Sequence, residues 1–289
     1  MSAGLRADFL ARREAVAARH GAVLEGRAGG RGVTIALIVV SFLVYFFGLY
    51  DLGVAPARLW SGLGQLGTIV ALMIPPSPGG HLALYVAALG QTLSIALIGM
   101  LLAAILALPF GFLAARNVVA NRVLHFITRR GLDTVRTVDT LIWALIWINV
   151  VGLGPFAGAL AIGSSDFGAL AKLMSEAIET ADRKPVEAVQ ASGGGALLTI
   201  RFGIVPQILP VYASQILYFF ESNTRSATIT GIVGAGGIGL HLYEQIRVLE
   251  WQQASFLIVM VLVTVAAIDY VSQRLRAAII GRRDPGRQG

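Results

Sequence analysis

The 289-residue sequence contains no cysteine and few charged residues. The absence of cysteine excludes disulfide bonds and cysteine-based metal sites, and the four histidines show no spacing typical of metal ligands. Charged residues make up 13% of the chain, whereas a soluble domain has about 25%. The chain has too few polar side chains to cover a water-exposed surface, and 56% of its residues are hydrophobic. We therefore expect an all-α integral membrane protein without a metal site.

Nucleotide-binding and catalytic motifs are also missing. The sequence has no G-x-x-x-x-G-K-[ST] loop, no H-E-x-x-H and no evident nucleophile–base pair. We therefore expect no cofactor and no enzymatic activity in this chain. The segment GAGGIG at 234–239 matches a dinucleotide-binding pattern, but its flanks are apolar and no acidic residue is well placed downstream. A turn or close backbone packing explains the glycines better, and we expect a turn or gate made of Gly231, Gly234, Gly236, Gly237 and Gly239.

The net charge of +7 is concentrated in four basic clusters, which hold 20 of the 23 lysines and arginines. The clusters alternate with apolar stretches, as cytoplasmic loops do under the positive-inside rule, and this distribution argues against nucleic-acid binding. The clusters are Arg6, Arg12, Arg13, Arg19, Arg27 and Arg31; Arg116, Arg122, Arg129, Arg130 and Arg136; Lys172, Arg183, Lys184 and Arg201; and Arg274, Arg276, Arg282, Arg283 and Arg287.

The apolar stretches predict about six membrane-spanning helices, since a bilayer core needs about 20 apolar residues per helix. An even number of crossings places all four basic clusters on the cytoplasmic side, together with both termini. We expect a basic cytoplasmic tail at 1–32, a transmembrane domain at 33–275 and a second basic cytoplasmic tail at 276–289. The predicted spans are about 33–50, 84–114 (with Pro109 expected to kink or shorten it), 137–152, 155–178, 205–230 and 253–273.

Two segments between the spans also have helical character. Apolar residues recur at helical spacing in 57–74, which is either an interfacial helix beside the translocation path or a helix packed on the bundle. The polar stretch between the fourth and fifth spans contains Pro185, which favours the first turn of a helix. We predict a short helix over Val186–Ser192 that ends at Gly193. Such a helix either docks into a partner protein or is a plain surface helix.

The same stretch resembles the E-A-A-x-x-x-G-x9-I-x-L-P loop of ATP-binding-cassette (ABC) importer permeases. Glu187-Ala188-Val189 followed by Gly193 carries the resemblance, and Val189, Gly203 and Val205 depart from the pattern. The resemblance implies that the cytoplasmic loop at about 180–204 holds a coupling helix that seats in a groove of a separate ATPase. The residues implied in this coupling are Pro185, Glu187, Ala188, Gly193 and Pro206.

Longer segments resemble the phosphonate-type permeases of phosphorus-oxyanion importers. They are 143–162, 172–179 and 221–239. This resemblance implies a type I importer permease in a bacterial inner membrane, paired with a second copy of itself. It also implies two ATPase subunits that bind ATP and magnesium, an external substrate-binding protein, and phosphonate, phosphite, hypophosphite or phosphate as substrate. A permease for another small solute, or an autonomous secondary transporter, remains the alternative, although the internal repeats that the latter predicts are absent.

The fifth span contains polar residues that predict a substrate pathway. Glu221 and Arg225 are four residues apart and share a helix face. An arginine near the bilayer centre costs about 2.5–3.5 kcal/mol, so it is expected to face a cavity or a partner. Asp166 in the fourth span either lines the same cavity or marks a misplaced boundary. The alternative is that Glu221 and Arg225 form a structural ion pair between helices. The predicted pathway residues are Glu221, Ser222, Asn223, Thr224, Arg225 and Asp166.

Overall fold

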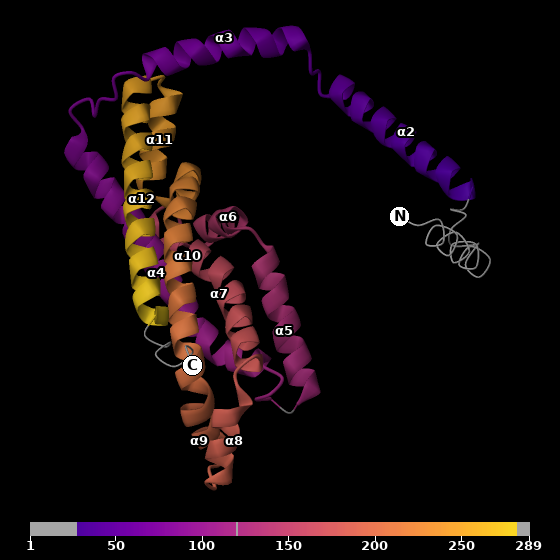
Figure 1. The fold of residues 1–289 in the computed structure, drawn as a ribbon. Coiled ribbons are helices and arrows are strands. Elements are labelled where there is room, and N and C mark those ends of the chain that lie inside the picture. Colours follow the sequence, from indigo (N-terminus) through magenta and orange to yellow (C-terminus); the bar gives the residue numbers. More distant parts are fainter. Residues whose placement is uncertain (1–27, 120, 282–289) are drawn as a thin grey trace, which may run out of the picture. The chain divides into compact units, whose positions relative to one another are not determined.

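The computed structural model describes residues 28–119 and 121–281, and this part of the chain contains helices and no strands (Figure 1). The chain divides into two units, which meet between Thr68 and Ile69 and are described separately. In order, the helices of eight or more residues are α2 (Ala28–Asp51), α3 (Pro56–Leu72), α4 (Leu82–Ala114), α5 (Arg122–Thr137), α6 (Thr140–Val151), α7 (Pro155–Glu179), α8 (Arg183–Ala191), α10 (Val205–Thr230), α11 (Ile238–Arg247) and α12 (Trp251–Gly281).

The N-terminal unit contains α2 and most of α3. Residues 32–51 of α2 are long and apolar enough to cross a membrane, which confirms the span predicted at 33–50. The basic tail expected at 1–32 lies mostly outside the described residues, and its last part, from Ala28, already belongs to α2. Helix α3 confirms that the amphipathic segment at 57–74 is helical; its position at the membrane interface stays a prediction.

The larger unit is built around α4 and α7, which pack along most of their length. Small side chains permit this close approach: a methyl group on Gly99 of α4 would lie 2.8 Å from the Ala159 carbonyl oxygen of α7. Helix α10 packs against both. Pro109 does not shorten α4, which continues to Ala114. The core here consists mainly of alanines and larger apolar residues, including Ala103, Ala107, Leu170, Met174, Ile178, Ile204 and Tyr212.

The described helices can be compared one by one with the six predicted crossings. In the described part of the chain, four helical segments are long and apolar enough to span a bilayer, at 32–51, 82–114, 196–235 and 251–279. At the third predicted span, 137–152, the structure has the short helix α6. Helix α6 has 12 residues, about 18 Å at 1.5 Å per residue, and it meets α5 at 90°. Only if this bent pair is one span does the number rise to five.

Helix α7 occupies the predicted fourth span, and its 25 residues are long enough to cross a bilayer. Its sequence is less apolar than that of the four segments named above, so it is not counted among them. Its neighbours are α4, α5, α6 and α10. A helix surrounded by other helices needs less apolar surface than one that faces lipid, because its polar side chains find protein partners. Enclosure therefore explains why α7 tolerates Asp166, Lys172 and Glu176 along its length.

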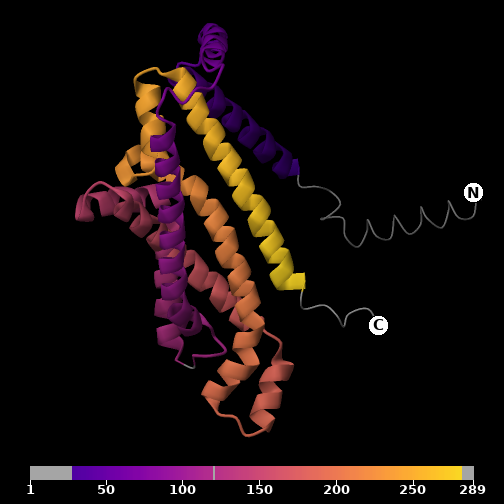
Figure 2. The same ribbon diagram turned by 90° about the vertical axis from the view of Figure 1, so that its left-hand side faces the viewer.

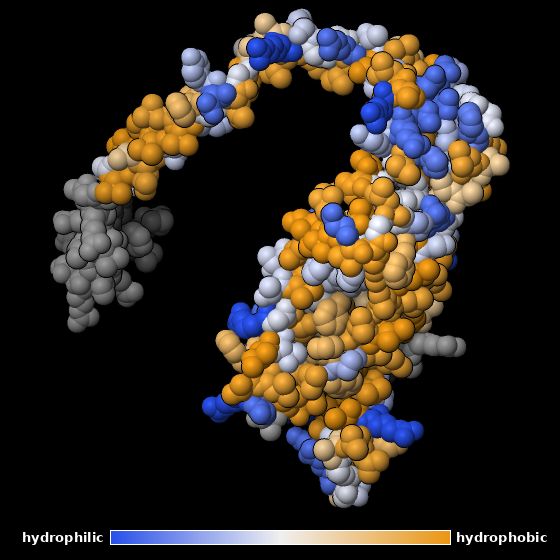
Figure 3. Space-filling model, turned by 180° about the vertical axis from the view of Figure 1, so that it is seen from behind, coloured by the Kyte–Doolittle hydropathy of each residue, from blue (hydrophilic) through white to orange (hydrophobic). Residues whose placement is uncertain are grey.

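The last helix is longer than expected. The sixth span was predicted to end at 273 and a tail to begin at 276, but α12 continues to Gly281. Arg274 and Arg276 therefore belong to the helix, and α12 runs beside α10 (Figure 2). In the space-filling view, hydrophobic side chains cover most of the bundle and hydrophilic ones gather toward its ends (Figure 3). This distribution is typical of a protein whose sides contact lipid.

Candidate functional site

Helix α8 is stabilised at both ends by its own sequence. The Asp182 carboxylate caps its start by accepting from the Lys184 amide at 3.1 Å. At its end, Gly193 adopts a φ of 81°, a left-handed conformation that favours glycine. The Gly193 amide donates to the Gln190 carbonyl at 2.9 Å and the Gly194 amide to the Val189 carbonyl at 3.0 Å, which together form a Schellman cap. The predicted short helix is confirmed, and it starts three residues earlier than Val186 because Asp182 caps it.

Helix α8 packs on its own chain along one side, where Val186 lies against Gly203, and leaves its other side exposed. None of its residues is buried, and it lies at one extremity of the bundle, with α9 (Ala196–Leu198) next to it (Figures 1 and 2). Beside α8, Leu197 is 83% exposed. A short ordered helix with apolar neighbours left exposed is typical of a docking element. A shallow groove of about 360 Å³ accompanies it, lined by Ala188, Val189, Ser192, Gly194, Leu198 and Phe202.

One contact that sequence reasoning missed joins the start of α8 to α10. The Asp182 amide donates to Gln207 Oε1 at 2.9 Å, and Gln207 Nε2 donates back to the Asp182 carbonyl at 3.1 Å. Gln207 lies in the first turn of α10, directly after Pro206. This reciprocal pair connects the exposed helix to the helix that carries most of the predicted pathway residues. The sequence signal was only a glutamine close to a proline, which points to no partner.

The predicted pair on α10 exists, and a third residue completes it. Arg225 Nη2 lies 3.6 Å from Glu221 Oε1, while Arg276 Nη2 of α12 lies 3.1 Å from Glu221 Oε2. The Glu221 and Arg276 side chains are 11% and 22% exposed, whereas the Arg225 side chain is 56% exposed. Arg276 therefore neutralises most of the buried carboxylate, and the Arg225 guanidinium keeps donors available for another partner.

Asp166 and Asn223 form a separate buried contact between α7 and α10. Asn223 Nδ2 donates to an Asp166 carboxylate oxygen, and both side chains are buried. Thr224 is buried as well and donates to the Phe220 carbonyl of its own helix at 3.1 Å. Asp166 and Asn223 therefore join α7 to α10, and Thr224 is bonded within its own helix.

The six predicted pathway residues therefore differ in their exposure. Successive residues of a helix are rotated by about 100°, so Ser222, Arg225 and Ser226 share one side of α10. Arg225 is exposed on that side, and the two serines are half-buried. Because a guanidinium is costly in lipid, this side of α10 is expected to face water or another protein.

The glycine turn after α10 is anchored to the bundle. Gly234, Gly236 and Gly237 have positive φ values, and the Gly237 amide donates to Gln91 Oε1 of α4 at 2.8 Å. The next amide, of Ile238, donates to Thr92 Oγ1 at 2.8 Å. Gly231 and Gly239 instead allow close packing of α10 and α11. The predicted turn is present, and its role as a gate stays a prediction.

Comparisons with known proteins agree with this geometry. Residues 107–284 match a family model described as "Binding-protein-dependent transport system inner membrane component". Over 254 residues, 88% of this chain and 87% of the relative, the chain is 35% identical to HtxC of Stutzerimonas stutzeri, named as a phosphite transport system permease protein. It is also 34% identical to the phosphate-import permease protein PhnE of Mycolicibacterium smegmatis, of which it covers 46%.

A solved structure has the same fold. The chain superimposes on a chain of the MetNI methionine ABC transporter with a TM-score of 0.63, over 70% of this chain and 99% of that one. The two are 19% identical in sequence, so the likeness concerns the fold alone. Among the described residues, no group of three or more histidines and acidic residues could hold a metal ion.

Proposed function

Because the chain belongs to the family of binding-protein-dependent transport system inner membrane components, we propose that it is the permease subunit of an ATP-driven importer for phosphorus oxyanions. Relatives named for phosphite and for phosphate import support this substrate class. The phosphonate-type resemblance seen in the sequence and the type I permease fold agree with it. Among phosphonate, phosphite, hypophosphite and phosphate, the shared chemistry is a tetrahedral or near-tetrahedral phosphorus oxyanion.

The observation that carries the proposal is the exposed, doubly capped helix α8. The nine-residue helix packs on its own chain at Val186, beside Gly203, yet none of its residues is fully buried. Short helices depend on tertiary packing, and the exposed side of α8 can supply more of it in a complex. Its exposed Glu187 and Ala188 occupy the positions expected to seat in an ATPase groove. In this proposal the separate ATPases bind ATP and magnesium, and movement of α8 reaches α10 through the Asp182–Gln207 hydrogen bonds.

The substrate path is proposed to run along the exposed side of α10. Arg225 and the hydroxyl groups of Ser222 and Ser226 offer donors of the kind that an oxyanion requires. A second copy of this chain would face that side and provide the same groups by two-fold symmetry. An external binding protein would deliver the anion to the pair, and both termini would lie in the cytoplasm, as the positive-inside rule indicates.

Uptake by the assembled transporter tests the proposal. A strain lacking the transporter is complemented with the permease, its ATPase and its binding protein, and uptake of phosphite, methylphosphonate and phosphate is measured. We expect uptake of at least one of them, and we expect Gly193→Pro to abolish it while the protein still inserts, because proline cannot adopt the positive φ of Gly193.

The matched control is Gly195→Ala, since Gly195 is four residues beyond the end of α8, has a φ of −70° and has open space around it. We expect Gly195→Ala and Glu187→Gln to differ: the first should keep substrate-stimulated ATPase activity, and the second should reduce it. Uptake of none of the three anions would overturn the substrate class. Full coupled activity of both the Gly193→Pro and the Glu187→Gln complexes would overturn the docking role of α8.

A further inference from the structure

A cationic cavity lies between α5 and α7, away from the exposed side of α10. It has a volume of about 770 Å³. Its walls carry five permanent cations and, among the lining residues, one acid, Asp133. None of the six predicted pathway residues lines it. The lining residues are Arg116, Val119, Arg122, His125, Phe126, Arg129, Arg130, Asp133 and Lys172.

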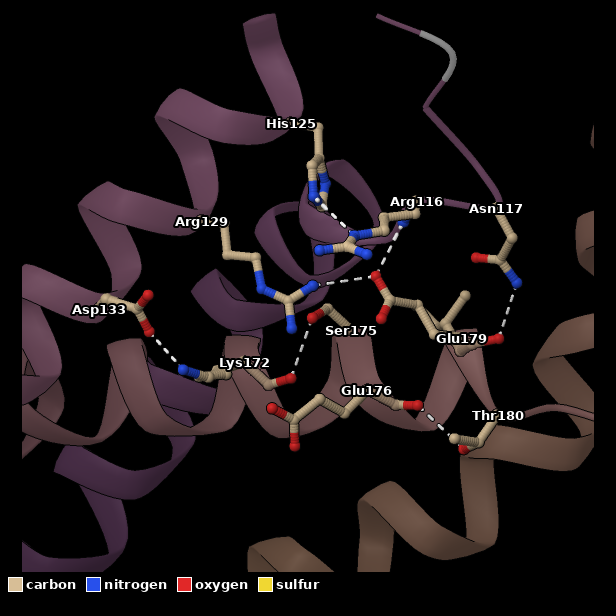
Figure 4. A network of polar contacts seen from close by, with 11 residues as sticks. Arg116, Asn117, His125, Arg129, Asp133, Lys172, Ser175, Glu176, Glu179 and Thr180 are labelled. Atoms are coloured by element: carbon tan, nitrogen blue, oxygen red, sulfur yellow. Dashed lines mark hydrogen bonds and ion pairs between the residues drawn. The ribbon is translucent and has the colours of Figure 1, made fainter. Parts of the chain in front are cut away.

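The acidic residues nearby neutralise only part of this charge. Arg129 Nη1 lies 3.1 Å from Glu179 Oε1, which also accepts from the Arg116 amide at 3.0 Å (Figure 4). Lys172 is paired with Asp133, and Arg130 Nη1 lies 3.4 Å from the same carboxylate. Five cations thus face two acids, and an excess of three positive charges remains. Repulsion among these cations is relieved when an anion enters.

The cavity also leaves guanidinium donors available for an occupant with acceptor oxygens. Arg116 Nε donates to His125 Nε2 at 3.4 Å. Arg122 is exposed and takes part in none of the ion pairs described above. Several guanidinium groups around one cavity match a tetrahedral oxyanion, which accepts paired hydrogen bonds from such groups.

We propose that the cavity between α5 and α7 is a binding site for a phosphate group, distinct from the substrate path. The phosphate group belongs either to an anionic phospholipid or to a free phosphorus oxyanion. The cavity is far larger than one oxyanion, so it has room for the remainder of a headgroup. Beside the cavity, Val123, Phe126 and Ile127 of α5 are exposed, and they suit contact with the acyl chains of a lipid bound there.

The site has a direct structural connection to the docking helix. Glu179 is the last residue of α7, and three residues separate it from α8. A phosphate group in the cavity competes with Glu179 for the Arg129 guanidinium. Since Glu179 also holds the Arg116 amide, occupation of the cavity changes the restraints on the segment that leads into α8.

Binding to the full-length permease in nanodiscs tests this proposal. The variant Arg122→Gln/Arg130→Gln removes two exposed cations and leaves the Glu179 and Lys172 ion pairs intact. The control Arg247→Gln/Arg274→Gln removes the same charge at exposed positions outside the cavity. Inorganic phosphate binding is measured by calorimetry in nanodiscs of neutral lipid. Retention of phosphatidylglycerol is measured by native mass spectrometry.

We expect at least one of the two ligands to bind about tenfold more weakly to the cavity variant than to the control. Loss of phosphatidylglycerol identifies the lipid as the source, and loss of inorganic phosphate binding identifies a free oxyanion. The proposal is overturned if both ligands bind equally to the two variants. Phosphate that all forms bind equally would be bound at the substrate path. This result would overturn the cavity proposal without affecting the proposed function, because the proposed function is tested separately by uptake.

Discussion

Arg276, near the end of α12, lies 3.1 Å from the Glu221 carboxylate of α10. Arg225, which is in α10 with Glu221, lies farther from this carboxylate, at 3.6 Å. The contact joins two helices across 55 residues of sequence. Glu221 is thereby neutralised from within the bundle, and Arg225 extends toward the exposed side. Arg276, which we expected in a cytoplasmic tail, therefore pairs with a residue of the fifth predicted span. Arg276 has the stabilising role, and Arg225 remains available to bind substrate.

The first prediction concerns stability. Arg276→Gln should lower the free energy of unfolding by about 1–3 kcal/mol, because a hydrogen bond to a largely buried charge is lost. Arg274→Gln, two residues away, should cost less than about 1 kcal/mol, since Arg274 is exposed and contacts only Tyr270 of its own helix in the described contacts. Thermal unfolding in detergent compares the two. Equal losses would show that the Glu221–Arg276 contact contributes nothing specific.

The second prediction concerns Asp166 and Asn223. Asn223→Leu should destabilise the protein by about 1–3 kcal/mol, because it leaves a buried carboxylate without the partner that joins α7 to α10. Replacing both residues by leucine should recover part of that loss, since neither polar group is then left unsatisfied. A double-mutant cycle on melting temperature measures the coupling. Additive losses would contradict a direct energetic link between the two side chains.

Local features of this fold were predictable because they depend on neighbours in sequence. The start of α8 near Pro185 and its end at Gly193 follow from first-turn and C-cap chemistry, and both are confirmed. The break between α5 and α6 also had a local signal, Asp139, whose carboxylate accepts from the Leu141 amide at 2.8 Å. The predicted start of the third span at 137 agrees with this break, whereas the short length of α6 was not predicted.

Contacts between distant residues were not predictable in the same way. The pairing of Glu221 with Arg276 depends on how α12 packs against α10, and no sequence spacing specifies it. The cavity between α5 and α7 likewise requires the basic cluster at 116–130 to fold back on Lys172 and Glu179. The basic residues predicted a cytoplasmic loop but gave no indication that this loop forms a cavity with α7.

The third prediction concerns the glycine turn. Gly239→Ala should disrupt the contact of α11 with α10, since its methyl group would lie 1.8 Å from the Thr228 carbonyl oxygen. We expect a lower melting temperature and reduced uptake. Gly90→Ala in α4 is the control, because open space surrounds Gly90 and alanine favours a helix. Wild-type stability and uptake in Gly239→Ala would show that the turn relocates easily, as a freely moving gate would.

The last prediction separates the two interpretations of Arg225. If the guanidinium contacts the substrate anion, Arg225→Gln should reduce uptake about tenfold or more, because a charge-assisted hydrogen bond contributes about 1.5–3 kcal/mol. Arg225→Lys should retain an intermediate rate, since lysine keeps the charge but loses the planar fork. Stability should change little in both, because Arg276 still neutralises Glu221.

The measurement is the KM and maximal rate of phosphite uptake by the assembled transporter, with melting temperature recorded on the same samples. Arg247→Gln, an exposed change outside α10, controls for loss of one positive charge. A structural role would lower the melting temperature of Arg225→Gln as much as that of Arg276→Gln and would leave the KM of folded protein unchanged. A substrate contact moves KM or rate without that loss, because the exposed guanidinium acts on the anion and not on the packing of its own helix.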